Sequence, residues 1–164
     1  MNSKYEHIVH PFPPLFDADS EILILGSLPS VKSREQMFFY GHPQNRFWKV
    51  IAAVTGEEVP LTIEDKKRLL LRNHIALWDT IYSCDIIGSS DSSIRNVVPT
   101  NLLPIVQQSH ITRVFCNGST SGKYYKKYQQ EILEMEAVTL PSTSPANAAY
   151  SLSKLIDLWC EKLQ

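Results

Sequence analysis

The sequence has few cysteines and no long apolar run. Its three cysteines, Cys84, Cys116 and Cys160, are odd in number and show no Cys-x-x-Cys spacing. This excludes a four-cysteine zinc or iron–sulfur site and disfavours a disulfide framework, so we expect reduced thiols in a cytoplasmic protein. The strongest apolar run, Ile22 to Leu25, is far shorter than the roughly 20 residues of a membrane-spanning helix, so we expect no membrane association.

An excess of charge of either sign is also missing. Sixteen basic residues against seventeen acidic ones give a formal net charge of -1, which excludes a globally basic nucleic-acid coat protein. A local basic face stays open, because the total does not say where the charges lie. The segment from Met1 to His10 lacks the apolar core of a signal peptide. His7 and His10 have no third ligand nearby, so we expect no metal site.

Short apolar runs alternate with segments of helical spacing along the 164 residues, a length that suits one domain over 1–164. The apolar runs are typical of strands buried on both faces. They are Glu21 to Gly26, Ile75 to Asp79, Arg113 to Gly118 and Ala137 to Pro141. The alternation predicts a three-layer α/β/α sandwich with a central four-stranded, mostly parallel sheet.

The helices between these strands are predicted from their spacing and their ends. Gly56 suits the end of the first long helix, and Thr62 suits the cap of the next. Thr100 is expected to cap a third helix. Ser144 and Pro145 are expected to begin the last one, as its cap and its first turn.

Two other segments are expected to be irregular. The proline-rich stretch Tyr5 to Ala18 should run extended over the surface, and the polar stretch Ser83 to Asn96 should form a long loop. In parallel sheets the working site lies beyond the carboxyl ends of the strands. The segments placed there are 27–45, 79–96, 117–121 and 142–147.

The loop after the first strand reads GSLPSVKS, without the GxGxxG pattern or the Gly-Lys-Ser/Thr ending of a P-loop, so we expect no nucleotide cofactor. The stretch FFYGHPQNRFW is more specific. We expect Phe47 and Trp48 in the core. Tyr40 and Asn45 lie on the loop side of the sheet, although Asn45 also suits a helix cap.

Four blocks of the sequence resemble the uracil-DNA glycosylase superfamily, and most closely its branch that removes hypoxanthine from deoxyinosine in DNA. They are ILGSLPS…FFYGHPQNRFWKVI, LWDTIYSCDIIGSSDSSIRN, FCNGSTSG and LPSTSPAN, in this order. The resemblance implies damaged DNA as the partner and base release by hydrolysis. No lysine nucleophile stands in the blocks, so we expect no strand cleavage. We also expect no cofactor, no metal and a monomer.

One residue departs from the wider superfamily. The mismatch-specific uracil branch has a catalytic asparagine in a Gly-Ile-Asn-Pro-Gly motif, where this sequence has Leu28. Leucine cannot hold a water molecule. The hypoxanthine branch instead relies on the asparagine of its His-Pro-x-Asn block, which corresponds to Asn45. The resemblance therefore implies that the Asn45 carbonyl oxygen positions the attacking water.

The resemblance also implies a pocket for a base rotated out of the duplex. The backbone at Gly26, Ser27 and Leu28 would hydrogen-bond the purine oxygen, and Tyr40 would stack on the base. Asn117 would read a base edge or, equally, form a turn.

Two more residues near this pocket keep two interpretations each. Asp79 either orders its loop, which we favour slightly, or faces the sugar cation. His42 is read as structural, with acid–base catalysis as the minority reading.

LPSTSPAN matches the loop that the superfamily inserts into the minor groove. Ser142 and Ser144 would bind phosphates beside the lesion, and Ala146 and Asn147 would occupy the gap left by the base. Further DNA contacts are expected from Ser30, Lys32 and Arg46, with Arg34, Lys123, Lys126 and Lys127 adding charge. Binding should then weaken with salt. The lysines of 123–127 equally suit a solvated helix face.

Three alternatives stay open. The enzyme would prefer uracil or xanthine if the size of its pocket suits them. The missing first-loop asparagine is also compatible with a lesion-binding module that does no chemistry. A flavodoxin-like binder of small ligands is disfavoured, because the first loop lacks a Ser/Thr-rich phosphate cradle. Measuring base release from a panel of lesions separates these cases.

Overall fold

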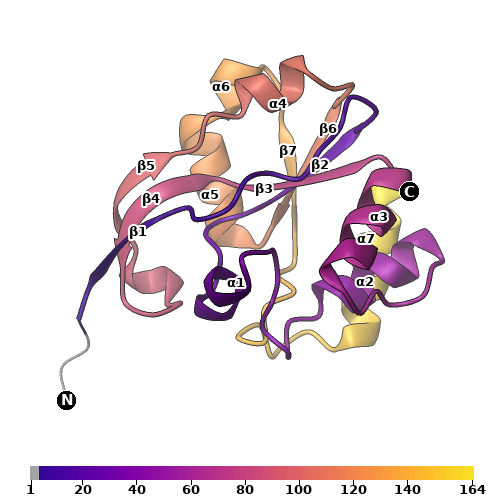
Figure 1. Ribbon diagram of the computed structural model, residues 1–164, viewed down its shortest axis with the longest axis horizontal. Helices are drawn as coiled ribbons and strands as arrows, with labels where there is room; N and C mark the ends of the chain where they lie inside the picture. The colour runs from indigo at the N-terminus through magenta and orange to yellow at the C-terminus, as the bar shows by residue number, and fades with distance from the viewer. Residues whose placement is uncertain (1–3) are drawn as a thin grey trace.

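The computed structural model describes residues 4–164, with a parallel sheet at its centre (Figure 1). Across the sheet the strands are β3 (Ile75–Asp79), β2 (Ile22–Gly26), β6 (Arg113–Asn117) and β7 (Ala137–Leu140). Every pairing is parallel, so the carboxyl ends of the strands meet at one edge, where Gly26 lies opposite Asp79. The predicted sheet is confirmed.

Helices cover both faces of this sheet, as the α/β/α prediction requires. On one side lie α2 (Phe47–Thr55), α3 (Ile63–Arg72) and α7 (Leu152–Leu163), and on the other α5 (Ser119–Tyr128) and α6 (Gln130–Leu133) (Figure 1). The short α1 (Val31–Gln36) follows the carboxyl end of β2, and α4 (Leu103–Gln107) precedes β6. Over residues 4–164, no helix has the length and apolar character to cross a membrane.

The ends of α2 and α3 follow from local chemistry. Gly56 ends α2 with a φ of 71°, a left-handed conformation that costs glycine little. Thr62 caps α3, because its side chain accepts a hydrogen bond from the backbone N–H of Asp65 at 3.1 Å. Both ends were predicted and are confirmed.

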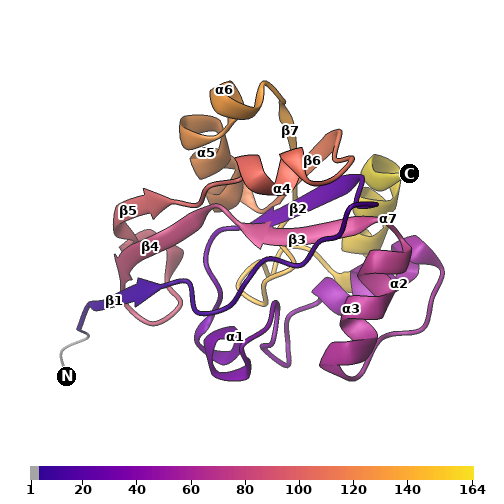
Figure 2. The same ribbon diagram turned by 45° about the horizontal axis from the view of Figure 1, so that its top comes forward.

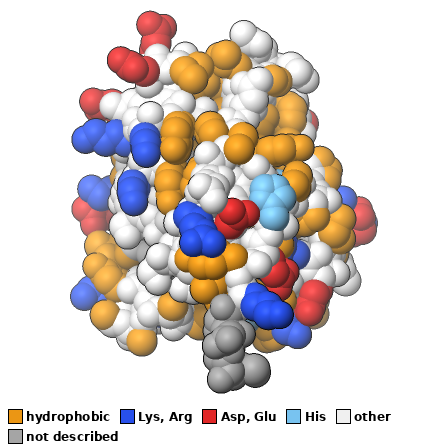
Figure 3. All heavy atoms as spheres, turned by 90° about the vertical axis from the view of Figure 1, so that its left-hand side faces the viewer, with side chains coloured by type: hydrophobic (Ala, Val, Ile, Leu, Met, Phe, Trp, Pro, Cys, Tyr) orange, Lys and Arg blue, Asp and Glu red, His pale blue; other side chains and the backbone are white. Residues whose placement is uncertain are grey.

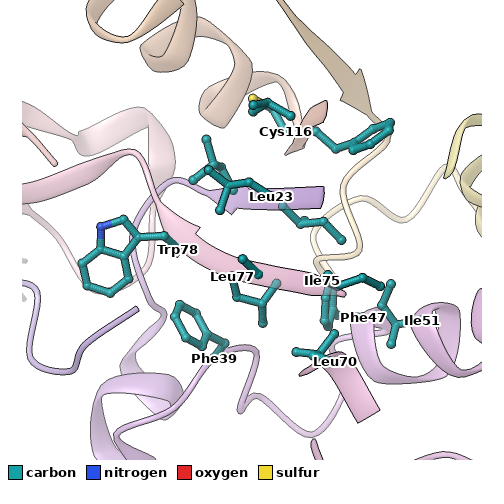
Figure 4. Close-up of a cluster of buried hydrophobic side chains, with 14 of the residues drawn as sticks. Leu23, Phe39, Phe47, Ile51, Leu70, Ile75, Leu77, Trp78 and Cys116 are labelled. Atoms are coloured by element: carbon teal, nitrogen blue, oxygen red, sulfur yellow. The ribbon is translucent and has the colours of Figure 1, made fainter. Parts of the chain in front are cut away.

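Part of the core lies between the parallel sheet and the α2 side of the molecule, and the same buried cluster continues to α5 and α6 on the other face. Figure 4 shows Leu23 of the central strand β2 and Leu77 of the edge strand β3 with Phe39, Phe47 and Ile51 around them. All five are at most 2% exposed. Burial of these apolar side chains is the main favourable term that holds the strands and helices together. The thiols are unpaired, and burial raises the pKa of the Cys116 thiol to about 11.

A second, antiparallel sheet was not predicted. It consists of β1 (Glu6–Val9), β4 (Ile81–Ile86) and β5 (Arg95–Pro99) in the order β1-β4-β5 and lies beside the parallel sheet (Figure 2). The predictions of an extended surface segment over Tyr5 to Ala18 and of a loop over Ser83 to Asn96 are therefore wrong in these parts. β1 and β5 are largely exposed, and β4 has polar residues among its apolar ones, so none of the three strands shows an uninterrupted apolar run.

Two predicted helix starts are also wrong. α4 begins at Leu103, while the Thr100 hydroxyl donates to the backbone oxygen of Asp79 at 2.7 Å. α7 begins at Leu152, where Ser151 caps it, so Ser144 and Pro145 belong to a loop. We call residues 142–150 the β7–α7 loop. Its backbone carbonyls bind Arg46, and a helix would have used those carbonyls itself.

Candidate active site

A cavity of about 360 Å³ opens at the edge where the parallel strands end. This volume is in the range of ~300–1,000 Å³ found for small-molecule sites. Residues after β2, β3, β6 and β7 contribute to its walls. Of the predicted site residues it gathers Gly26, Ser27, Leu28, Ser30, Tyr40, Asn45, Asn117, Ser142, Ser144 and Ala146. Lys32, Arg46 and Asn147 lie outside the cavity lining.

Asn45 lies on the wall of this cavity with its amide held from two sides. Its Oδ1 accepts from the backbone N–H of Phe47 and from the Thr143 hydroxyl, each at 2.9 Å. The first contact satisfies the first N–H of α2, although the cap residue of this helix is Arg46 and Asn45 lies one position before it. Because an amide oxygen has two lone pairs, Oδ1 is filled, and only the Nδ2 donors are free to act in the cavity. The expectation that Oδ1 holds a water does not fit this geometry.

Thr143 orients Asn45 and was missed by sequence reasoning. It is fully buried, and its hydroxyl accepts from Asn117 Nδ2 at 3.0 Å while donating to Asn45. Asn117 Oδ1 in turn accepts from the Thr143 backbone N–H at 3.0 Å. Both atoms of the Asn117 amide are therefore engaged, which leaves at most one Nδ2 hydrogen for a base edge. Asn117 ties the end of β6 to the β7–α7 loop.

Tyr40 lines the cavity beside the end of β2, since a Cβ added to Gly26 would lie 3.2 Å from its hydroxyl oxygen. Its ring stacks on Phe47 with centroids 4.0 Å apart, so only the opposite face is open to a base. Its hydroxyl is buried and has no hydrogen-bond partner among residues 4–164. Burial raises the pKa of this hydroxyl, and the negative charge of Asp79 raises it further, while the nearby Asn117 amide opposes the rise only in part. The group therefore stays protonated and can donate.

Asp79 and His10 form a buried pair at the floor of the cavity. The His10 Nε2 and Asp79 Oδ2 atoms lie 2.6 Å apart, and the two side chains are 0% and 5% exposed. The imidazole contacts the Phe12 ring edge-on and packs closely against the Trp78 ring. Sequence reasoning weighed His10 only as a metal ligand beside His7, and no local motif joins it to Asp79.

A family model described as the uracil DNA glycosylase superfamily matches residues 13–164. This chain belongs to the uracil DNA glycosylase superfamily. The superfamily resemblance of the sequence blocks is thereby confirmed.

Two of the similar proteins are curated relatives from Methanosarcina species. A curated hypoxanthine DNA glycosylase from Methanosarcina acetivorans is 34% identical over 145 residues, covering 87% of this chain and 90% of the relative. One from Methanosarcina barkeri is 35% identical over 116 residues, covering 69% and 73%. A solution NMR structure of a provisionally named uracil DNA glycosylase from Methanosarcina acetivorans aligns with a TM-score of 0.78 and 30% identity, covering 94% and 98%.

In this superfamily member the Arg46 side chain points into the β7–α7 loop. Its guanidinium donates to the backbone oxygens of Ser144, Asn147 and Tyr150, and more weakly to that of Thr143. The expected phosphate contact of Arg46 is therefore not supported, because four of its five N–H donors bond backbone oxygens inside the protein. The side chain instead fixes the shape of the β7–α7 loop.

The loop also braces itself through its own polar side chains. Ser142 Oγ accepts from the Ser144 backbone N–H, and Ser144 Oγ accepts from that of Ala146. Asn147 Nδ2 donates to the Ser142 backbone oxygen at 2.9 Å. The serine hydroxyl protons stay free to donate, and Ala146 is exposed at the loop surface.

The remaining predicted cations lie on two helices, Lys32 and Arg34 on α1 and Lys123, Lys126 and Lys127 on α5. Lys32 pairs with Glu35 at 3.4 Å on exposed α1, and Arg34 donates to the backbone oxygens of Pro29 and Gly88. The α1 cap is Ser30, whose Oγ accepts from the Ser33 backbone N–H. On the face shown in Figure 3, Lys and Arg side chains lie in several places with acidic side chains between them.

Proposed function

We propose that this superfamily member hydrolyses the N-glycosidic bond of deoxyinosine in DNA, releasing hypoxanthine and leaving the strand intact. Support comes from the curated relatives, which carry the name hypoxanthine DNA glycosylase. The observation that carries the proposal is the place of Asn45, held by Thr143 on the wall of a cavity at the carboxyl edge of the sheet.

The target base must leave the duplex to reach this cavity, at a cost of a few kcal/mol in lost stacking and pairing. The stacking on Tyr40 expected from the sequence is replaced here by an edge contact, because Phe47 already stacks on one face of the ring and the Tyr40 hydroxyl lies at the floor of the cavity. The β7–α7 loop, which Arg46 and the loop's own side chains brace through hydrogen bonds, enters the space that the base leaves. A loop held by these hydrogen bonds has less conformational freedom to lose on binding.

Hydrolysis passes through an oxocarbenium-like transition state, with negative charge growing on the departing base. Asn45 Nδ2 donates a hydrogen bond to the oxygen of the attacking water. The second lone pair of that oxygen stays free to attack C1′. Backbone N–H groups of Ser27 and Leu28 stabilise charge on the base oxygen. No residue of this set is a strong base, so positioning of water carries most of the rate.

The test is release of free hypoxanthine from a duplex with one deoxyinosine, with strand integrity measured before and after alkali. Asn45→Ala should slow release about 100-fold, the size of effect seen when a reacting group is misplaced. Asn101→Ala is the matched control, because Asn101 Oδ1 likewise accepts a first-turn N–H, that of Leu103 in α4, away from the cavity.

Full activity of Asn45→Ala would remove the assignment of the water-holding residue. Tight lesion binding by the wild type without any base release would instead favour the non-catalytic module. Uracil and xanthine substrates in the same assay rank the preferred lesion.

A further inference from the structure

The floor of the cavity presents one acceptor and one donor without partners. Asp79 Oδ2 is bonded to His10, whereas Asp79 Oδ1 has no hydrogen bond among residues 4–164. The Tyr40 hydroxyl also lacks a partner there. A Cβ added to Gly26 would lie 2.5 Å from Asp79 Oδ1 and 3.2 Å from Tyr40 Oη. Both oxygens therefore border the same point at the end of β2, which only glycine leaves open.

His10 determines which oxygen of Asp79 is available. A carboxylate can only accept, so the imidazole Nε2 is the donor of the 2.6 Å contact. Trp78 and Phe12 pack on the ring with centroids 4.1 and 4.7 Å away, which prevents it from turning aside. The pair thus holds Oδ2 below the floor and leaves Oδ1 at the surface of the cavity.

We propose that Asp79 Oδ1 and Tyr40 Oη together recognise the lactam edge of the flipped base, with Asp79 accepting from a ring N–H and Tyr40 donating to the neighbouring carbonyl. This inference rests on the proposed function and defines its substrate class. Deamination of adenine turns a bare N1 beside an amino group into an N1–H beside a carbonyl. Asp79 Oδ1 and Tyr40 Oη therefore complement the edge of the deaminated base. Adenine would bind less well, because its bare N1 and the carboxylate oxygen are both hydrogen-bond acceptors.

His10 is a positioning residue in this scheme, and its effect should appear in base preference. Losing one complementary hydrogen bond in a buried site should reduce discrimination about 10- to 100-fold. A role of Asp79 toward the sugar cation makes a different prediction, because it would affect every base equally.

The experiment measures binding, so that it does not depend on catalysis. Duplexes carry 2′-fluoroarabino-inosine or 2′-fluoroarabino-adenosine at one position, since the fluorine disfavours the oxocarbenium-like transition state and prevents cleavage. Wild type should prefer the inosine duplex at least 10-fold. In Asp79→Asn, His10 keeps the amide oxygen and the amide nitrogen faces the base, so the preference should fall at least 10-fold and shift toward adenine.

Asp85→Asn is the matched control, because Asp85 also bonds a histidine but lies outside the cavity. It should keep the wild-type preference. If Asp79→Asn does not fold, as judged by near-UV circular dichroism, Tyr40→Phe decides, since it removes only the unpartnered hydroxyl. His10→Phe should reduce the preference without changing any atom of the cavity lining.

An unchanged preference in folded Asp79→Asn, or in Tyr40→Phe where that variant decides, would overturn this inference. So would equal binding of the two duplexes by wild type. The proposed function fails separately, if wild type releases no hypoxanthine from ordinary deoxyinosine while the binding preference persists.

Discussion

Two histidine–aspartate pairs join the N-terminal segment to neighbouring strands, one under the cavity and one on the surface. His10 and Asp79 lie 2.6 Å apart with side chains 0% and 5% exposed. His7 and Asp85 lie 2.9 Å apart with side chains 63% and 26% exposed. The second pair joins residues that are opposite each other in β1 and β4. The two contacts share their chemistry and differ in access to water.

That difference decides what each pair does. Water replaces a lost partner at the surface, so an exposed pair adds little to stability. In the interior nothing replaces the partner, and the remaining group stays buried without compensation. A buried pair is therefore better suited to fix the direction of a side chain, which is the role inferred for His10 toward Asp79.

Removing each histidine should separate the two pairs most clearly. His10→Ala should lower the free energy of unfolding by about 3–5 kcal/mol, because it leaves the Asp79 carboxylate buried and unpaired. His7→Ala should stay close to wild type. Urea titrations at pH 7 measure both. Equal losses would mean that burial does not distinguish the pairs.

Acid should reveal the surface pair. Hydrogen bonds from Asn96 and then from His7 lower the pKa of Asp85. A lowered native pKa means that the stabilisation is present above the ordinary carboxyl pKa and is lost as pH falls through the native one. Asp85→Asn should therefore unfold with a weaker dependence on pH below about 4. Thermal melts of the variant and of wild type from pH 7 to pH 2 check this, and parallel curves would contradict it.

Salt should have the smallest effect. The Debye length falls from about 10 Å at 0.1 M to about 3 Å at 1 M, which screens exposed charges and leaves buried pairs nearly unaffected. Any remaining cost of His7→Ala should vanish in about 1 M NaCl, while the cost of His10→Ala should persist. Parallel urea titrations at the two salt concentrations provide the measurement. A His10→Ala cost that disappears in salt would contradict the burial of that pair.

The parallel sheet was predictable because its strands are buried on both faces. Ile22 to Leu25 and Ile75 to Trp78 are uninterrupted apolar runs, and each ends at the edge that carries the site. The antiparallel sheet was not predictable, because β1 and β5 are largely exposed and β4 carries the polar residues Ser83 and Asp85 among its apolar ones. Ser144 and Pro145 failed as a helix start because Arg46, far away in sequence, binds the carbonyls around them.

For this protein, sequence alone determined the parallel sheet, the superfamily and the loops that meet at the cavity, including Tyr40 and Asn45. Local periodicity and motif order carry that information. Only the tertiary structure decided that Thr143 fills the Asn45 oxygen and that His10 lies under Asp79. Such contacts join residues 98 and 69 positions apart. Their partners are selected by burial and packing, which no local pattern of residues records.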